Sequence, residues 1–287
     1  MAHHRGPRPH SSPRFLKFAA VLALLGGFFY WSNHSLQVED FTFSSPRLPA
    51  GFDGAVIVHL TDIHGAYFGE HNEKLYDAVR EAKPDYIVLT GDILDSYRET
   101  PHAYAGELCR DLAQIAPTYV ITGNHEWALP DPRGLKRILR ESGATLLDNR
   151  FVTLERQGDS IVLAGIDDPN GFADQKTPEK LAEEVQAAFS HPFWILLAHR
   201  NDRFASQYSL LGADLVMAGH GHGGIIRLPF TDGLVSHKTL FPSYTAGFYE
   251  ENGSTLFVSR GLGNSGASFR LFNRPQIAVL TLRRDTP

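Results

Sequence analysis

Short apolar runs alternate with amphipathic segments along most of the chain. Six of the apolar runs have strand length and are rich in Val, Ile and aromatic residues: 55–60, 86–91, 118–123, 161–165, 193–198 and 214–219. Apolar residues at helical spacing occupy four segments between them: 72–82, 103–115, 132–142 and 177–189. This alternation predicts an α/β fold whose sheets are buried on both faces. From Ile225 to Leu282 no helical pattern separates the strand-like runs, so we expect a largely antiparallel region there.

The first 52 residues follow a different pattern. Residues 1–14 are basic and proline-rich, and we predict that they are disordered. Residues 15–31 are apolar except for Lys17, and they end in bulky aromatic residues that suit a lipid interface better than a cleavage site. We therefore predict a membrane anchor at 15–31, with a cleaved signal peptide as the alternative. A linker and first strand region at 32–52 would follow, and then one large domain at 53–287.

The charges around the apolar run predict an orientation. Arg5, Arg8, Arg14 and Lys17 precede the run, and the first charges after it are acidic. The positive-inside rule then predicts a single-pass protein of the cell membrane whose large domain lies outside the cytoplasm, in the periplasm or at the cell exterior. A run this short is also compatible with a helix that lies in the membrane interface without crossing it.

Charge and cysteine content exclude some classes of function. The 287-residue chain has a net charge of -5, and all 32 acidic residues lie after the four basic residues of the N-terminal segment. An acidic domain lacks the surface expected of a nucleic-acid binder, so nucleic acid is an unlikely partner. Cys109 is the only cysteine, which excludes an intrachain disulfide and a thiolate metal cluster.

Five of the apolar runs are each followed by residues of types that bind metal ions. In chain order these residues are Asp62 and His64, Asp92, Asn124 and His125, His199, and His220 and His222. Each motif alone is also an ordinary turn sequence. Together they recur at the carboxyl ends of strands, where α/β sheets bind ligands, and neighbouring glycines allow the sharp turns required. A metal centre explains this recurrence better than a flexible turn or a single structural metal clip.

The motifs D-x-H, G-D, G-N-H-E, a single H and G-H-x-H, in this order, resemble those of the calcineurin-like metallophosphoesterases. The resemblance covers Val56 to His222, and it is greatest to the bacterial membrane-associated branch of the family. It implies a four-layer αββα sandwich with two central mixed sheets, here with an N-terminal transmembrane helix. It also implies that residues 53–287 form a hydrolase domain that contains two divalent metal ions.

The resemblance assigns a role to each residue of the motifs. Asp62, His64 and His222 would hold one ion, Asn124, His199 and His220 the second, and Asp92 would bridge both. His125 would not bind metal but would protonate the leaving group of the substrate. Oxygen and imidazole ligands suit Mn, Fe, Zn or Mg, and no thiolate narrows this choice.

The resemblance is less specific about the substrate than about the family. It favours a phosphodiester or diphosphate in a phosphorylated small molecule or lipid, such as UDP-2,3-diacylglucosamine of lipid A biosynthesis. UDP-linked precursors are handled on the cytoplasmic face, however, which conflicts with the orientation predicted from charge. A nuclease or cyclic-nucleotide phosphodiesterase is an alternative, and a non-catalytic scaffold of the same fold is another.

Three positions depart from the usual family pattern. Asn201 stands where the single-histidine motif His-x-Pro commonly has proline, Gly221 replaces a threonine, and Ile225 replaces a glutamine. None of these departures removes a predicted ligand, but they affect loop shape. Asp95, three residues after Asp92, is expected to cap a loop or helix.

Overall fold

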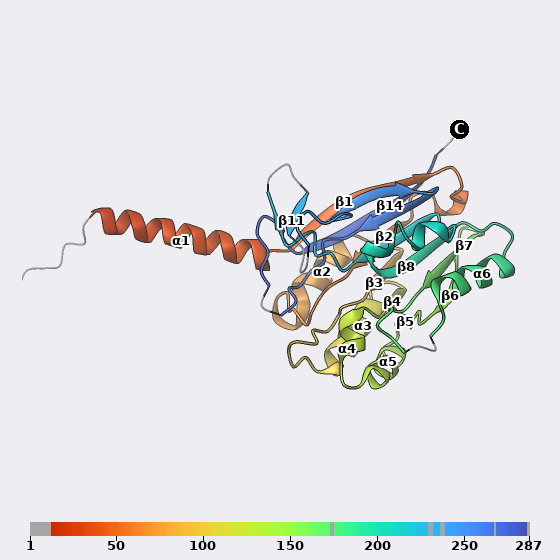
Figure 1. Ribbon diagram of the computed structural model, residues 1–287, viewed down its shortest axis with the longest axis horizontal. Helices are drawn as coiled ribbons and strands as arrows, with labels where there is room; N and C mark the ends of the chain where they lie inside the picture. The colour runs from red at the N-terminus through yellow and green to blue at the C-terminus, as the bar shows by residue number, and fades with distance from the viewer. Residues whose placement is uncertain (1–12, 173–174, 229–231, 236–238, 267, 286–287) are drawn as a thin grey trace, which may run out of the picture.

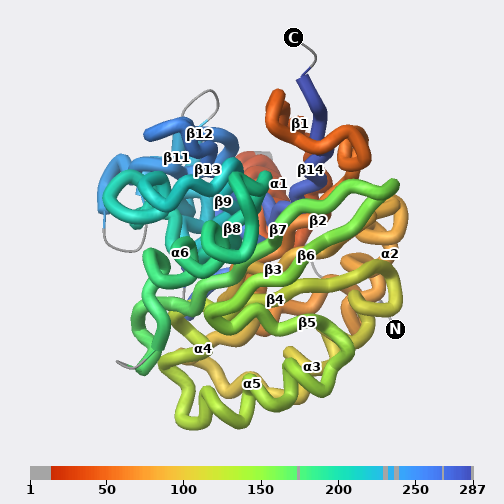
Figure 2. Tube along the Cα trace, turned by 90° about the vertical axis from the view of Figure 1, so that its right-hand side faces the viewer, coloured from red at the N-terminus to blue at the C-terminus, as the bar shows by residue number. Residues whose placement is uncertain are grey.

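The computed structural model describes residues 13–172, 175–228, 232–235, 239–266 and 268–285. Most of the predicted disordered tail therefore lies outside the described residues. The described strands form two six-stranded sheets and a small two-stranded one (Figures 1 and 2). The two large sheets are both mixed, and this confirms the predicted α/β fold class.

The first sheet has the order β1-β14-β2-β3-β4-β5. Its strands are β1 (Gln37–Ser45), β14 (Gln276–Arg284), β2 (Val56–Leu60), β3 (Tyr86–Thr90), β4 (Thr118–Ile121) and β5 (Thr145–Leu146). Strands β2 to β5 run parallel to one another, while β14 is antiparallel to β2 and parallel to β1. The carboxyl ends of β2, β3 and β4 therefore lie along the same edge.

The second sheet has the order β12-β13-β9-β8-β7-β6. Its strands are β12 (Gly247–Glu251), β13 (Ser254–Val258), β9 (Leu215–Gly219), β8 (Trp194–Arg200), β7 (Asp159–Gly165) and β6 (Arg150–Arg156). Strands β13, β9, β8 and β7 are parallel, and the two outer strands are antiparallel to their neighbours. The small sheet pairs β10 (Ile226–Arg227) with β11 (Gly233–Val235).

Helices cover the outer face of each large sheet (Figure 2). The first sheet packs against α2 (Glu73–Glu81), α3 (His102–Ala113) and α5 (Pro132–Glu141), and the second against α6 (Pro178–Ala188). A third apolar core, which includes Ile57, Leu197 and Phe257, lies between the two sheets. Because the central strands β2, β3, β8 and β9 are removed from water on both faces, they are nearly continuous apolar runs.

The six predicted strands and four predicted helices are present, with ends that differ by one or two residues for nearly all of them. The prediction of a largely antiparallel C-terminal region is wrong in part. The β12–β13 pair is antiparallel, but β13 runs parallel to β9 and β14 runs parallel to β1. Both strands enter sheets beside strands that are distant in sequence, and local pattern does not reveal such neighbours.

The N-terminal helix α1 (Pro13–His34) extends away from the two sheets (Figure 1). It is longer at both ends than the predicted anchor at 15–31. At 1.5 Å per residue, 22 residues span about 33 Å, close to the thickness of a bilayer core of about 30 Å. By length and composition this helix is able to cross a membrane. The predicted division of the chain into an anchor, a linker and a catalytic domain stays a prediction, although β1, within 32–52, belongs to the first sheet.

Candidate metal centre

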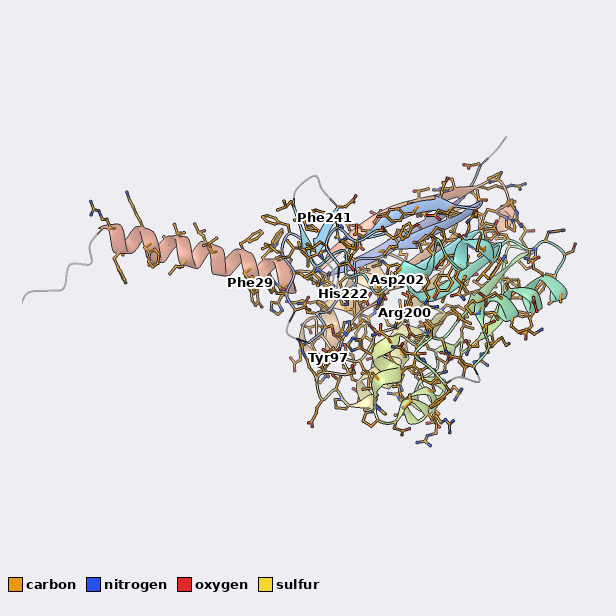
Figure 3. The ribbon with its side chains drawn as sticks, in the orientation of Figure 1. Phe29, Tyr97, Arg200, Asp202, His222 and Phe241 are labelled. Carbon is orange, nitrogen blue, oxygen red and sulfur yellow. The ribbon has the colours of Figure 1, made fainter. Side chains whose placement is uncertain are left out.

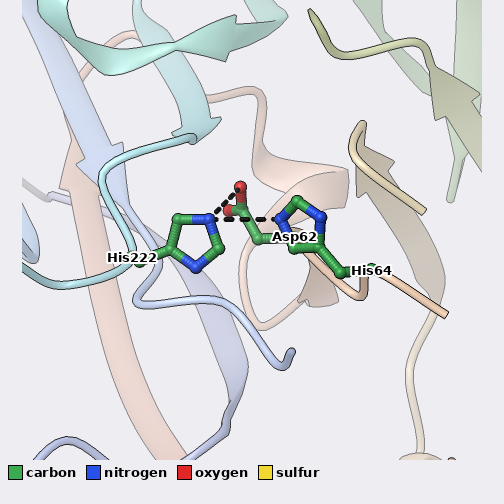
Figure 4. Close-up of side chains that lie close together, drawn as sticks. All are labelled: Asp62, His64 and His222. Carbon is green, nitrogen blue, oxygen red and sulfur yellow. Dashed lines mark hydrogen bonds and ion pairs between the residues drawn. The ribbon is translucent and has the colours of Figure 1, made fainter. Parts of the chain in front are cut away.

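Two groups of metal-ligating side chains lie at the carboxyl ends of the parallel strands. The first group is Asp62, His64 and His222 (Figure 4). Nε2 of His64 lies 3.2 Å from Nε2 of His222, which lies 3.5 Å from Oδ1 of Asp62. Asp62 and His64 follow β2, while His222 follows β9. This group therefore joins loops from both large sheets.

The second group surrounds His199 at the end of β8. Nε2 of His199 lies 3.1 Å from Oδ1 of Asn124 and 3.2 Å from Nδ1 of His220. The other ring nitrogen, Nδ1, donates to the carbonyl oxygen of Thr90 at 2.8 Å. A backbone acceptor of this kind fixes the ring so that Nε2 faces the group, as in histidines that bind metals.

Asp92 lies between the two groups. Its Oδ2 is 3.1 Å from Nε2 of His199 in the second group and 3.8 Å from Nε2 of His64 in the first. Its Oδ1 accepts a hydrogen bond from the backbone N–H of His125 at 2.9 Å. One carboxylate oxygen therefore reaches both groups, which is the position that a bridging ligand requires. All seven predicted ligands and His125 thus lie together, although their individual roles stay a prediction.

The donor atoms are suited to cations. In the group of Asp62, His64 and His222, the potential ligand atoms all lie within 4.8 Å of one another. Burial lowers the pKa of His64 to about 3, so this imidazole is neutral and keeps a lone pair for a metal. The facing Nε2 atoms of His64 and His222 both carry lone pairs unless one is protonated, and a cation between them would satisfy both. The residues present therefore fit divalent metal ions.

The two carboxylates concentrate negative charge in this buried centre. Burial raises the pKa of Asp62 to about 6. Burial would also raise the pKa of Asp92, but the adjacent His199 outweighs it and holds this pKa well below its usual range. The pKa of His199 is raised to about 10, because Asp92 outweighs the lowering caused by burial. The negative charge of Asp92 thus favours positive charge beside it, which divalent cations would supply in the metal-bound protein.

The backbone at the centre adopts conformations that side-chain-bearing residues rarely take. Five of the seven candidate ligands have φ in the left-handed region: Asp62 (51°), His64 (50°), Asp92 (52°), His220 (68°) and His222 (48°). Such conformations cost about 1–3 kcal/mol each and persist where the surrounding structure enforces them, commonly at functional sites. The fold therefore holds these residues in unfavourable backbone conformations, at a cost in stability, and their side chains point toward one place.

Two glycines make room for the carboxylates. A side chain at Gly219, which ends β9, would overlap the carboxylate of Asp62. A side chain at Gly123 would overlap Oδ1 of Asp92. The glycines of the G-N-H-E and G-H-x-H motifs are thus explained by close packing against the ligands as well as by turn geometry.

His125 lies beside the two groups and has its own set of partners. Its Nδ1 accepts from the backbone N–H of Ser96 at 3.0 Å, and its Nε2 lies 3.2 Å from Oγ of Ser265. Its Nε2 is 4.0 Å from Oδ2 of Asp92, so this edge of the ring faces the metal centre. This orientation suits a residue that exchanges a proton with a substrate bound there.

Asp95 contacts His125, which sequence reasoning missed. Its Oδ1 lies 3.3 Å from Nδ1 of His125, and the side chain is fully buried. It also accepts from the backbone N–H of Tyr97 at 3.0 Å and of Gly266 at 2.9 Å. The expected loop cap is therefore present, and the same carboxylate also contacts the ring of His125. The sequence feature that could have indicated this contact is a second aspartate three residues after Asp92.

Glu126 is a second residue whose position the sequence did not reveal. Its carboxylate accepts from the backbone N–H groups of Asp92, Leu94 and Gly123 at 2.7–2.9 Å. It therefore holds the loop after β3 against the loop after β4. Burial raises the pKa of Glu126 to about 7. With these three backbone donors, the carboxyl group of Glu126 fixes the position of Asp92. It does so without contacting the side chains of the two ligand groups.

Two of the departures from the family pattern fit together. A Cβ atom at Gly221 would lie 2.6 Å from Nδ2 of Asn201. That nitrogen donates to the carbonyl oxygen of Tyr244 at 2.7 Å, which fixes the side chain. Asn201 therefore occupies the space that a larger residue at 221 would need. Arg200, labelled in Figure 3, is also fixed. Its Nε donates to Asp168 at 2.7 Å.

Comparisons with known proteins agree with this arrangement. A family model described as calcineurin-like phosphoesterase matches residues 55–224. An uncharacterized metallophosphoesterase of Bacillus subtilis, YkuE, is 32% identical over 92% of this chain and 93% of its own length. A zebrafish transmembrane protein with a metallophosphoesterase domain is 29% identical over 94% of this chain and 62% of its own length.

The family match extends over more than half of the chain and includes every residue of the two ligand groups. The B. subtilis relative aligns over nearly its full length. Proteins of this family use binuclear metal sites, and the buried Asp and His groups are consistent with one. The chain belongs to the calcineurin-like phosphoesterase family and is a metal-dependent hydrolase of phosphoric esters.

Proposed function

We propose that this protein is a membrane-anchored phosphoesterase with two metal ions that hydrolyses a phosphodiester or a diphosphate of a lipid-linked substrate. The most specific candidate is UDP-2,3-diacylglucosamine. The observation that carries the proposal is that the last turn of the anchor helix α1 contacts Arg270, whose Nη2 lies 3.4 Å from Nδ1 of His222 in the first ligand group.

The positions of the residues support the roles that the family resemblance gives them. Asp62, His64 and His222 would hold one ion, Asn124, His199 and His220 the other, and Asp92 both. Two divalent ions at such a centre stabilise the charge of the phosphoryl oxygens and supply a nucleophile at neutral pH. His125 directs Nε2 toward this centre and would give its proton to the leaving oxygen, a contribution of about 10²–10⁴-fold.

The attachment of α1 to the rest of the protein supports an uncleaved anchor. In its last turn Ser32 and Asn33 are buried, and Asn33 both donates to and accepts from the backbone of Arg270, at 2.9 and 2.7 Å. Arg274 stacks on Trp31 with 4.7 Å between the guanidinium and the ring centroid. Removal of α1 as a signal peptide would leave these partners without their contacts.

The catalytic proposal is tested on the purified full-length protein in detergent. Bis-p-nitrophenyl phosphate, p-nitrophenyl phosphate and UDP-2,3-diacylglucosamine are compared with Mn²⁺ present and after chelation. We expect metal-dependent hydrolysis of the diester and of the UDP-lipid, and slower hydrolysis of the monoester. Loss of activity on all three with bound metal present would favour a non-catalytic scaffold. Activity confined to cyclic nucleotides or DNA would favour the nucleotide-directed alternative.

Orientation in the membrane is tested separately. The basic residues before the apolar run favour a domain outside the cytoplasm, while a UDP-linked substrate favours the cytoplasmic face. Protease is added to intact spheroplasts of an expressing bacterium. Digestion of the domain supports the outward orientation. Survival until the membrane is lysed contradicts it and supports the cytoplasmic substrate.

A further inference from the structure

The last turn of α1 contacts the loop that leads from β13 to β14, residues 259–275. Ser32 donates to the carbonyl oxygen of Arg270 at 3.1 Å, in addition to the two hydrogen bonds between Asn33 and Arg270. Asn264 donates to Oδ1 of Asn33 at 3.2 Å. The last turn of the apolar helix and this loop are thus in direct contact. The loop therefore lies at the point where the apolar part of α1 ends.

Two aromatic residues of this loop pack against the apolar helix itself. The rings of Phe272 and Phe28 have centroids 4.8 Å apart, and those of Phe269 and Phe29 are 5.5 Å apart. Phe28 and Phe29 lie one turn inside the apolar run, and Phe269 and Phe272 remain 43% and 46% exposed. If α1 is in a bilayer, these two rings are at the depth of its outermost apolar layer.

Further exposed apolar side chains continue from this loop. Leu228 follows β10, which lies beside the loop because Arg227 donates to the carbonyl oxygen of Leu271 at 3.0 Å. Phe241 is bonded through its backbone to Leu234 on the paired strand β11. On the opposite side of the loop Tyr97 lies against Gly266. Figure 3 shows Phe241 and Tyr97 on either side of the base of α1, with His222 between them.

We define the membrane-facing rim as Tyr97, Leu228, Leu240, Phe241, Phe269 and Phe272. Tyr97, Leu240 and Phe241 are 70–77% exposed. Large exposed apolar groups that adjoin one another mark an interaction surface. Because Phe269 and Phe272 of this rim pack against an apolar helix, a lipid bilayer is the partner whose chemistry matches both, and aromatic residues are favoured at its interface.

The same loop touches the metal centre. Arg270, between the two aromatic residues of the rim, has Nη2 3.4 Å from Nδ1 of His222. Ser265 lies 3.2 Å from Nε2 of His125. One short loop therefore contacts the anchor helix on one side and both a candidate ligand and the candidate proton donor on the other.

We infer that the membrane-facing rim lies in the interface of the bilayer that holds α1, and that the metal centre acts on phosphoesters in its headgroup layer. The substrate class is thus a phosphoester whose apolar part stays in the membrane. This inference rests on the proposed phosphoesterase function for its chemistry, but the position of the rim in lipid is independent of that function.

The position of the rim is tested with a fluorescent probe in the full-length protein. Burial raises the pKa of the Cys109 thiol to about 12, so this native cysteine will not compete for labelling. Phe241→Cys is labelled with an environment-sensitive dye and compared with Glu183→Cys. Glu183 is 68% exposed on α6, at the end of the molecule remote from α1 (Figure 1). Both proteins are reconstituted in phosphatidylcholine vesicles with and without nitroxide-labelled lipid.

We expect blue-shifted emission at position 241, quenched at least about twofold more by nitroxide lipid than at 183. Equal, water-like emission at both positions overturns the inference. A blue shift at 241 without lipid quenching also overturns it, because a second protein copy would then cover the rim.

Activity provides a second readout. Phe241→Ser and Glu183→Ser are compared on UDP-2,3-diacylglucosamine in vesicles and on soluble bis-p-nitrophenyl phosphate. We expect the ratio of lipid to soluble turnover to fall about tenfold for Phe241→Ser only, because one aromatic contact with lipid is lost. An unchanged ratio contradicts a role for the rim in lipid turnover. If the unsubstituted protein hydrolyses neither substrate, the proposed function fails, while the quenching result still decides where the rim lies.

Discussion

The two large sheets contribute different chemistry to the metal centre. The loops after β2, β3 and β4 of the first sheet supply both carboxylates, the amide and one imidazole, from Asp62, Asp92, Asn124 and His64. The second sheet supplies only imidazoles, from His199, His220 and His222. The first sheet therefore supplies the negatively charged ligands. The second sheet supplies imidazole nitrogens, which are neutral ligands when they are deprotonated.

This difference shows how charge is distributed over a buried site. Unpaired buried carboxylates are costly, and here they face imidazoles of the other sheet at 3.1–3.5 Å. Neither side has enough ligands for two ions, so metal binding depends on the packing of the two sheets. Substitutions on the charged side should accordingly affect activity more than substitutions on the imidazole side.

The largest effect is expected for Asp92→Asn. The amide keeps an acceptor for the backbone N–H of His125 but removes the charge near both ligand groups. Loss of several kcal/mol of charge stabilisation lowers kcat/KM by about a thousandfold. His220→Asn, on the imidazole side, should cost less. Metal analysis and kcat/KM of the two variants measure the difference, and a larger loss for His220→Asn would contradict the comparison.

His125→Asn should keep both metal ions and lose proton donation. Turnover of substrates with poor leaving groups should fall by about 10²–10⁴-fold. Turnover of bis-p-nitrophenyl phosphate should change little, since p-nitrophenolate leaves without a proton. The measurement is kcat for a series of diesters with different leaving groups. Equal losses across the series, with metal content unchanged, would exclude the general-acid role.

A smaller loss is expected for Asp95→Asn. The variant keeps an acceptor for the backbone N–H of Tyr97 but removes the buried charge 3.3 Å from Nδ1 of His125. Because His125 itself remains, we expect a loss in kcat smaller than that of His125→Asn, about tenfold. If Asp95 acts through His125, the loss should depend on the leaving group as it does for His125→Asn. A uniform loss accompanied by a lower Tm would show that Asp95 is only structural.

The fold and the ligand groups were largely predictable because both depend on local pattern. The apolar runs of strand length predict where the strands lie. Once β2, β3 and β4 are parallel, the residues that follow Leu60, Thr90 and Ile121 lie at the same edge of the sheet. The contacts of Asp95 and Glu126 were not predictable. Each depends on where the loops after β3 and β4 meet, and no local sequence pattern encodes that distance. The direction of β14 beside β1 was hidden for the same reason.

The smallest effect is expected for Gly221→Ala, which changes the packing of the loop on the imidazole side. Gly221→Ala places a methyl group 2.6 Å from Nδ2 of Asn201, whose hydrogen bond to Tyr244 resists displacement. Overpacking of about 1 kcal/mol between His220 and His222 should lower kcat/KM about fivefold without loss of either carboxylate. Asn201→Ala removes the obstacle, so Gly221→Ala in that background should cost almost nothing. A double-mutant cycle on kcat/KM measures this coupling. If the two losses simply add, Asn201 does not limit the size of residue 221, and the two departures from the family pattern are independent.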